Sequence, residues 1–259
     1  MLDNIGSIIF NLAYLLIVWI ALVLVLVKNR GKEKTAQWKW VFASFFLLGF
    51  GDIFHLLTRT YVFFKGTAEN SLGTIYGQSD IISLLGFGLI ATSITAQLFY
   101  LGLYFYWRDG EKKKLQSSPN HHSSKKPFLF LDSVMVVATV LRMVLVAHLS
   151  QNMWGAQLEA PNLFRYLTNA PLYVAGIVCV VLFSKRALTT GYEKIEGFSS
   201  KDRKMVKNVV IWMLVSFITY SITLFFSWEN PIAGMAMIPK TIAYLIMLLY
   251  FYKGLLVKR

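Results

Sequence analysis

The chain has 259 residues, of which 56% are hydrophobic and 15% aromatic, and it carries a formal net charge of +13. This composition is typical of a polytopic membrane protein rather than of a soluble globule. With Cys179 as its one cysteine, the chain excludes an intramolecular disulfide and a cysteine-based metal site. Nucleic-acid binding is not expected either, because the basic stretches lack interleaved aromatic residues.

Seven apolar stretches are long enough to cross about 30 Å of hydrocarbon at about 1.5 Å per residue. They predict an all-α fold, a polytopic membrane protein with seven transmembrane helices in a single domain, residues 1–259. The predicted spans are 5–27, 38–63, 80–107, 127–149, 163–184, 207–228 and 238–256. No connection between them is long enough to fold as a separate domain.

The basic residues predict how these spans are oriented. They gather in the first, third and fifth connections and in the C-terminal tail. The exceptions are Lys65 and the basic residues inside predicted spans: Arg59, Arg142, Arg165 and Lys240. Under the positive-inside rule, the N-terminus then lies outside the cell membrane and the C-terminus in the cytoplasm. We expect the basic loops to contact anionic membrane lipids and to be available to a cytoplasmic protein partner.

The second predicted span holds three ionisable side chains, Asp52, His55 and Arg59. At about 3.6 residues per turn, Asp52 and Arg59 lie within about 20° of each other on the helical wheel. His55 lies about 60° away on the same side. A charge at the bilayer centre costs at least about 2.5–3.5 kcal/mol, so we expect these side chains to face a polar pocket.

Other predicted spans carry polar residues at a similar depth. Arg142 lies slightly outside the middle of the fourth span, Arg165 and Asn169 are one turn apart in the fifth, and Lys240 lies in the first turn of the seventh. The cytoplasmic half is nearly bare of charge, apart from Asp132, whose carboxylate suits a helix N-terminus and is predicted to be structural. We therefore predict that the second, fourth, fifth and seventh spans line one water-filled cavity that opens outward.

Cations outnumber anions at this predicted site, since Asp52 is its one deep carboxylate. A carboxylate, a phosphate or a phospholipid headgroup from outside would complete the charge balance, and arginine binds such groups bidentately. Asp52 would position Arg59 or Arg142, and His55 would make binding depend on pH near neutrality. The predicted function is binding of a small anionic ligand or lipid headgroup, in sensing or uptake. The predicted ligand-binding residues are Asp52, His55, Arg59, Arg142, Arg165, Asn169 and Lys240.

Two alternatives stay open at this point. Asp52 and His55, three residues apart, could act as the general base of an intramembrane lipid hydrolase. Otherwise the charges only pair between helices or extend to the interface, in a structural or assembly protein without a ligand. No cofactor or metal is expected: Lys240 lies too near the outer end for a retinal Schiff base, and the histidines are too few for a three-histidine zinc site.

Several stretches share a recognisable pattern. They are GDxFHLxxR at Gly51–Arg59, TSIT at Thr92–Thr95, RMVL at Arg142–Leu145, NxP at Asn169–Pro171 and IPKT at Ile238–Thr241. In these stretches the chain resembles an uncharacterised family of bacterial seven-helix membrane proteins. The resemblance implies a seven-helix membrane fold and singles out the same polar residues, but it implies no activity.

Overall fold

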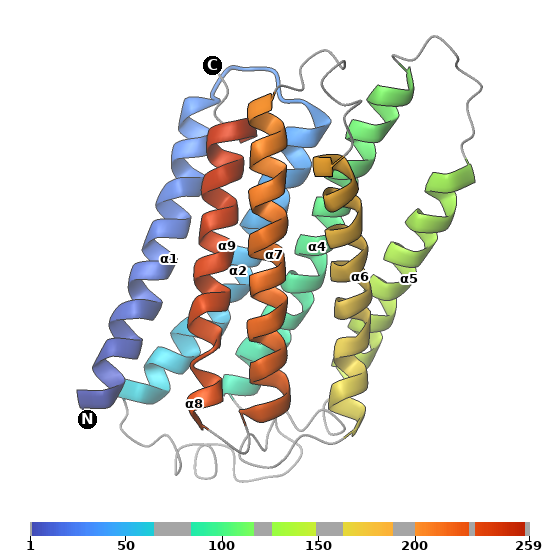
Figure 1. Cartoon of the computed structure of the whole chain (residues 1–259). Coiled ribbons are helices and arrows are strands. Elements are labelled where there is room, and N and C mark those ends of the chain that lie inside the picture. The colour runs from blue at the N-terminus through green and yellow to red at the C-terminus, as the bar shows by residue number, and fades with distance from the viewer. Residues whose placement is uncertain are drawn as a thin grey trace.

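The computed structural model describes residues 2–64, 84–116, 126–148, 163–188, 200–227 and 231–256. Every regular element within these ranges is a helix, which confirms the predicted all-α class (Figure 1). The long helices are α1 (Leu2–Lys28), α2 (Ala36–Phe64), α4 (Leu84–Gln116), α5 (Lys126–Ala147), α6 (Leu163–Leu188), α7 (Ser200–Phe226) and α9 (Met237–Phe251). The short helix α8 (Pro231–Gly234) precedes α9, and a π-helical turn, η2 (Tyr252–Leu256), extends it.

Six of the described helices are long and apolar enough to cross a membrane, which indicates a multi-pass membrane protein. These candidate spans are Ile8–Lys28, Ala36–Tyr61, Gly86–Leu115, Phe128–Ala147, Leu163–Leu188 and Asp202–Phe226. They correspond to the first six predicted spans. The seventh stretch forms α9, which has only 15 residues.

Some helices extend beyond the predicted spans, because charged residues continue them. α4 runs on to Gln116, beyond the predicted limit of 107, and its last turn contains Lys113 and Lys114. α7 begins at Ser200 rather than at 207, with Asp202 in its first turn. Hydropathy marks only the apolar part of a helix, whereas lysine, arginine and glutamate are themselves good helix formers outside it.

The long helices alternate in direction along the chain and pack as one bundle (Figure 1). α2 lies between α1 and α4, and α4 also contacts α5 and α6. α7 lies between α6 and α9, and α9 with η2 returns to α1. α5 and α6 are thus on the far side of α4 and α7 from α1.

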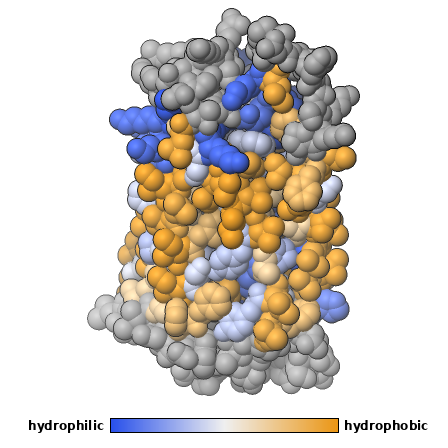
Figure 2. Space-filling model, turned by 45° about the vertical axis from the view of Figure 1, so that its right-hand side comes forward, coloured by the Kyte–Doolittle hydropathy of each residue, from blue (hydrophilic) through white to orange (hydrophobic). Residues whose placement is uncertain are grey.

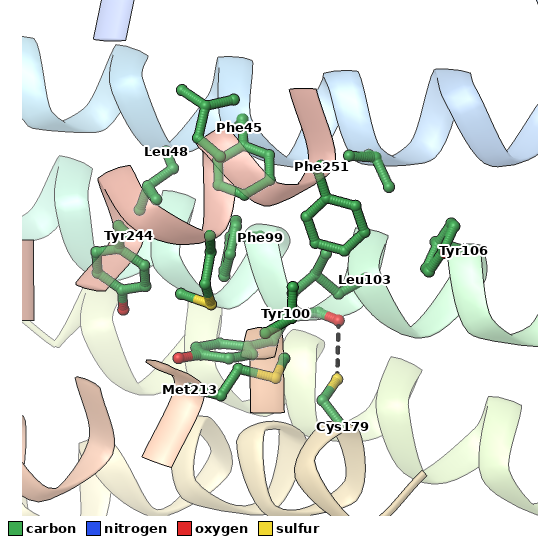
Figure 3. Close-up of a cluster of buried hydrophobic side chains, with 14 of the residues drawn as sticks. Phe45, Leu48, Phe99, Tyr100, Leu103, Tyr106, Cys179, Met213, Tyr244 and Phe251 are labelled. Atoms are coloured by element: carbon green, nitrogen blue, oxygen red, sulfur yellow. Dashed lines mark hydrogen bonds between the residues drawn. The ribbon is translucent and has the colours of Figure 1, made fainter. Parts of the chain in front are cut away.

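Aromatic and sulfur-containing side chains fill the centre of the bundle (Figure 3). Phe45 of α2 packs edge-to-face against Phe99 of α4, with ring centroids 5.2 Å apart, and Phe251 packs against Phe45. Such pairs add about 0.5–1.5 kcal/mol each beyond their buried area. Cys179 is fully buried in this core, and its thiol donates to the carbonyl of Tyr100 at 3.3 Å.

The outside of the bundle is apolar. Figure 2 shows a belt of hydrophobic residues, with strongly hydrophilic side chains concentrated toward one end. Large aliphatic side chains face outward on separate helices, among them Ile9 on α1, Val137 on α5 and Ile177 on α6. Soluble monomers rarely expose so continuous an apolar surface, so these faces are suited to lipid acyl chains.

α2 and α4 approach each other most closely, at places where one of them carries glycine. A Cβ atom at Gly51 would collide with the side chain of Thr95, and one at Gly102 would collide with Ser44. Small residues at a membrane helix interface let two backbones come together, because lipid provides no hydrophobic driving force for association. This packing fixes the face that α2 turns toward α4.

Gly88 provides the sharpest test of this packing. A Cβ at position 88 would lie 2.9 Å from both the Cα of His55 and the carbonyl oxygen of Phe54. Backbone atoms cannot rotate away, so Gly88→Ala should push α2 and α4 apart and lower the free energy of unfolding by about 1–3 kcal/mol. Denaturant unfolding in detergent, followed by circular dichroism, measures this loss.

Gly6→Ala is the matched control, because nothing lies within 4 Å of a Cβ at that position of α1. It should be neutral or slightly stabilising, since alanine is the better helix former by about 1 kcal/mol. Equal unfolding free energies for the two variants would contradict the close α2–α4 contact.

Candidate functional site

Asp52 joins three helices through its two carboxylate oxygens. The hydroxyl of Tyr14 on α1 donates to Oδ2 at 2.7 Å, and Thr92 Oγ1 on α4 donates to Oδ1 at 3.3 Å. The aspartate itself is half-buried on α2. Hydrogen bonds to an ionised carboxylate are about twice as strong as neutral ones, which helps to offset the cost of placing this group within the bundle.

A cavity of about 250 Å³ lies beside Asp52, between α1, α2, α4 and the α8–α9 segment. At about 30 Å³ per molecule, it has room for on the order of eight waters. The polar side chains on its wall include Asn11, Asp52, His55, Arg59, Thr92 and Lys240. Apolar side chains, including Phe10, Leu48, Leu56 and Ile238, form the rest of the wall.

Lys240 enters this cavity from the first turn of α9. Its ammonium group lies 4.2 Å from the ring centroid of Tyr220 and 5.8 Å from that of Tyr244. Asp52 attracts it electrostatically, but in the described part of the chain no carboxylate lies within 4.0 Å of it. A cation held over aromatic faces gains about 0.5–2 kcal/mol, and keeps its hydrogen-bond donors for another partner.

His55 and Arg59 follow Asp52 along the same face of α2, as the helical wheel predicts, and both line the cavity. His55 is 9% exposed, and its Nδ1 is buried with no hydrogen-bond partner among the described residues. Asp52 accepts from Tyr14 and Thr92, and no hydrogen bond joins it to His55 among the described residues.

Arg142, Arg165 and Asn169 form a second group between α5 and α6. Arg142 is 2% exposed and donates from Nη1 to the carbonyl of Thr168 and to Asn169 Oδ1, at 2.9 Å for the latter. The amide of Asn169 donates to the carbonyl of Arg165 at 2.8 Å, and Arg165 is half-buried one turn earlier on α6. None of these three side chains lines the cavity.

The prediction of one cavity lined by the second, fourth, fifth and seventh spans is therefore wrong in part. The second and seventh, α2 and α9, do line it, but α1 and α4 replace the other two. The physical reason is the packing order: α5 and α6 lie beyond α4 and α7, so Arg142 finds its partners on α6. The expectation that Asp52 positions Arg142 is wrong for the same reason.

Tyr220 on α7 connects the two groups. Its hydroxyl donates to Asn169 Oδ1, the same atom that accepts from Arg142, while the face of its ring lies against the Lys240 ammonium. The hydrogen bond fixes the ring, and the ring in turn confines the ammonium. The α5–α6 group therefore influences the cavity without contacting it.

Sequence reasoning missed the contributions of Asn11, Tyr14, Tyr220 and Tyr244. A signal existed for the first two, because Asn11 and Tyr14 are three apart in an otherwise apolar stretch and so share a face of α1. The other two had no distinguishing signal, since tyrosine is equally common in cores and at membrane interfaces.

Asp132 lies apart from the cavity, in agreement with its predicted structural role. Its Oδ1 accepts a hydrogen bond from Tyr104 at 2.7 Å, and its Oδ2 pairs with Arg108 at 3.2 Å. Both partners lie on α4, so this carboxylate connects α5 to α4. The predicted helix-dipole interaction is wrong, because α5 begins at Lys126 and Asp132 lies beyond its first turn; the ion pair with Arg108 gives the structural role instead.

No known protein-family model matches this chain, and neither a curated protein nor a solved structure shows significant similarity to it. Within the ranges that the structure describes, no three histidine, cysteine, aspartate or glutamate side chains lie close enough together to hold a metal ion. The geometry of the cavity is therefore the basis for the function proposed below.

Arg142→Met separates the two polar groups experimentally. The substitution leaves the carbonyl of Thr168 and Asn169 Oδ1 without their charged donor, so the free energy of unfolding should fall by about 1–3 kcal/mol. Lys240→Met leaves no hydrogen-bond acceptor unpaired and removes contacts with two ring faces and the attraction of Asp52, so it should cost less, about 0.5–2 kcal/mol. Denaturant unfolding in detergent measures both, and a larger loss for Lys240→Met than for Arg142→Met would refute this division.

Proposed function

We propose that the cavity beside Asp52 binds a small anionic group, a carboxylate or a phosphate, as the ligand site of a membrane protein that acts in sensing or uptake. The observation that carries this proposal is the position of the Lys240 ammonium, which lies on the cavity wall against two tyrosine rings rather than against a carboxylate.

The charges on the wall favour an anion. Lys240 places a positive charge on the wall with no carboxylate within 4.0 Å among the described residues, while the Asp52 carboxylate already accepts from Tyr14 and Thr92. A ligand carboxylate or phosphate would receive hydrogen bonds from the ammonium. In a site of low dielectric such charge-assisted bonds are stronger than in water.

The predicted roles of the other basic residues change with the geometry. Arg142, Arg165 and Asn169, which were expected to hold the anion, support it at a distance by fixing Tyr220 against Lys240. Asp52 is best assigned to the attraction of Lys240 and to the anchoring of α1 and α4.

A hydrolase using Asp52 and His55 is less well supported than a binding site. A general-base dyad needs a hydrogen bond between the carboxylate and the imidazole, or between each of them and a reacting group. Here the carboxylate accepts from Tyr14 and Thr92 instead. A purely structural role accounts for the α5–α6 group but leaves the cavity and its ammonium without a purpose.

The proposed topology has seven spans in the cell membrane, with the N-terminus outside the cell and the C-terminus in the cytoplasm. α9 and η2 together cover Met237–Leu256, about 30 Å at 1.5 Å per residue, so this segment reaches across the hydrocarbon. The basic ends of α1, α4 and α6 lie at one side of the bundle and the cavity lies at the other. The positive-inside rule then makes the cavity open outward.

The binding role is tested with inorganic phosphate and acetate as probes. Purified protein in lipid nanodiscs should bind at least one of them, and Lys240→Met should weaken that binding about tenfold or more, because the ligand loses a charged donor. Isothermal titration calorimetry measures the affinity.

Lys253→Met is the matched control, since Lys253 is exposed in η2 away from the cavity, and it should bind like the unchanged protein. Absence of binding for both anions, or equal affinity in both variants, would overturn the proposal.

The orientation is tested by cysteine labelling, for which the chain is well suited because Cys179 is fully buried. In intact cells, a membrane-impermeant maleimide should label Gly6→Cys in α1 but not Lys253→Cys in η2. Lysed cells should label both, and the unchanged chain serves as the background. The reverse pattern in intact cells would disprove the proposed orientation.

A further inference from the structure

The cavity wall is divided between charged and apolar side chains. Lys240 and Arg59 provide the cationic part, and Phe10, Leu56 and Ile238 are among the apolar side chains of the same hollow. A ligand that is charged throughout, such as a free inorganic ion, would leave that apolar wall uncovered. The two-part wall matches a molecule with an anionic head and an alkyl portion.

The helices that border the cavity are fastened together at the far end. Lys28 Nζ donates to the hydroxyl of Tyr252 at 2.8 Å, and Asn29 Nδ2 donates to the carbonyl of Leu256 at 2.6 Å. The indole of Trp38 donates to the same carbonyl at 3.1 Å. These bonds tie η2 to the connection between α1 and α2, at the basic end of the bundle.

At the cavity end, α1 and α9 separate. Figure 1 shows the two helices drawing apart toward the end where the N-terminus lies. The α1 side chains on the cavity wall, Phe10 and Asn11, belong to this end, and so do Met235 and Ile238 opposite them. We call the boundary between Phe10 and Asn11 on one side and Met235 and Ile238 on the other the α1–α9 seam.

The seam borders both the cavity and the apolar outside of the bundle. Met235 lines the cavity and is also 61% exposed, in the break between α8 and α9. Ile9, next to Phe10, is 62% exposed on the outer face of α1. Met235 comes two residues before the segment proposed to cross the hydrocarbon, so the seam lies near the outer surface of the bilayer.

We infer that the ligand is an amphiphile, with a phosphate or carboxylate headgroup in the cavity and an alkyl chain that passes through the α1–α9 seam into the bilayer. This inference rests on the anion-binding function proposed above. About 250 Å³ accommodates a headgroup but not a long chain, so the chain must leave the cavity. The seam offers it an apolar path that avoids water, and the Lys240 ammonium holds the head.

The test uses dodecyl phosphate with a diazirine on its chain, added to nanodiscs that contain the protein. After irradiation, mass spectrometry should locate the label on α1 around Phe10 and on the segment around Met235 and Ile238. Lys240→Met should reduce this labelling about tenfold or more, because the head loses its charged partner. Label spread evenly over the apolar faces, that of Val137 on α5 included, and indifferent to Lys240 would refute the inference.

A blocked seam provides a second readout. Met235→Trp should reduce seam labelling by dodecyl phosphate about tenfold, because the larger side chain obstructs the alkyl path. Val137→Trp is the matched control, since Val137 is also 61% exposed but lies on α5, away from the cavity. It should label like the unchanged protein, and unaltered labelling of Met235→Trp would also overturn the inference.

The two proposals can fail separately. If phosphate or acetate binds in a Lys240-dependent manner but the diazirine label avoids the seam, the anion site stands and the amphiphile is excluded. If neither probe binds and no Lys240-dependent label appears, both proposals are wrong.

Discussion

The close approach of α2 and α4 is the constraint on which the rest of the site depends. Gly51 and Gly88 remove the side chains that would hold these two backbones apart, and Gly102 does the same nearer the basic end. With the helices in contact, Asp52 comes within hydrogen-bond distance of Thr92, and Tyr14 reaches it from α1. A bilayer contributes little to helix association, so this steric fit has to supply the attraction through close packing.

The two polar groups illustrate two ways of keeping charge inside a membrane protein. Arg142 donates from Nη1 to a carbonyl and an amide oxygen of α6, while its buried Nε has no hydrogen-bond partner among the described residues. Lys240 is stabilised by aromatic faces and a more distant Asp52, and it borders a cavity. The first cation is held by acceptors of the protein away from the cavity, whereas the second has its ammonium donors on the wall of a cavity. This difference, rather than the number of charges, distinguishes a site from a structural contact.

The sequence predicted the membrane class, the all-α fold and the approximate position of six candidate spans, because apolar length is a local property that hydropathy measures directly. It also identified Asp52, His55, Arg59 and Lys240 as residues that share a pocket. It failed to separate Arg142 and Asn169 from them. Depth along a helix can be read from the sequence, but the neighbour that a side chain faces depends on packing order and on rotation about the helix axis. The cost of burying a charge indicates that a partner exists without indicating which helix provides it.

The two ends of the bundle are held together differently, and this difference affects how a bound ligand would act. At the basic end, three hydrogen bonds from Lys28, Asn29 and Trp38 fasten η2 to the α1–α2 connection. At the other end, a broken helix and a hollow lie where α1 and α9 have drawn apart. A headgroup bound beside Lys240 would add contacts between α9 and the other helices that line the cavity. Tyr220 on α7 contacts both Lys240 on α9 and Asn169 on α6. A displacement of α9 at this point would therefore act on α6 and α7, whose far ends carry basic residues. The structure thus provides a continuous physical connection from the cavity to the helices whose basic ends are proposed to face the cytoplasm.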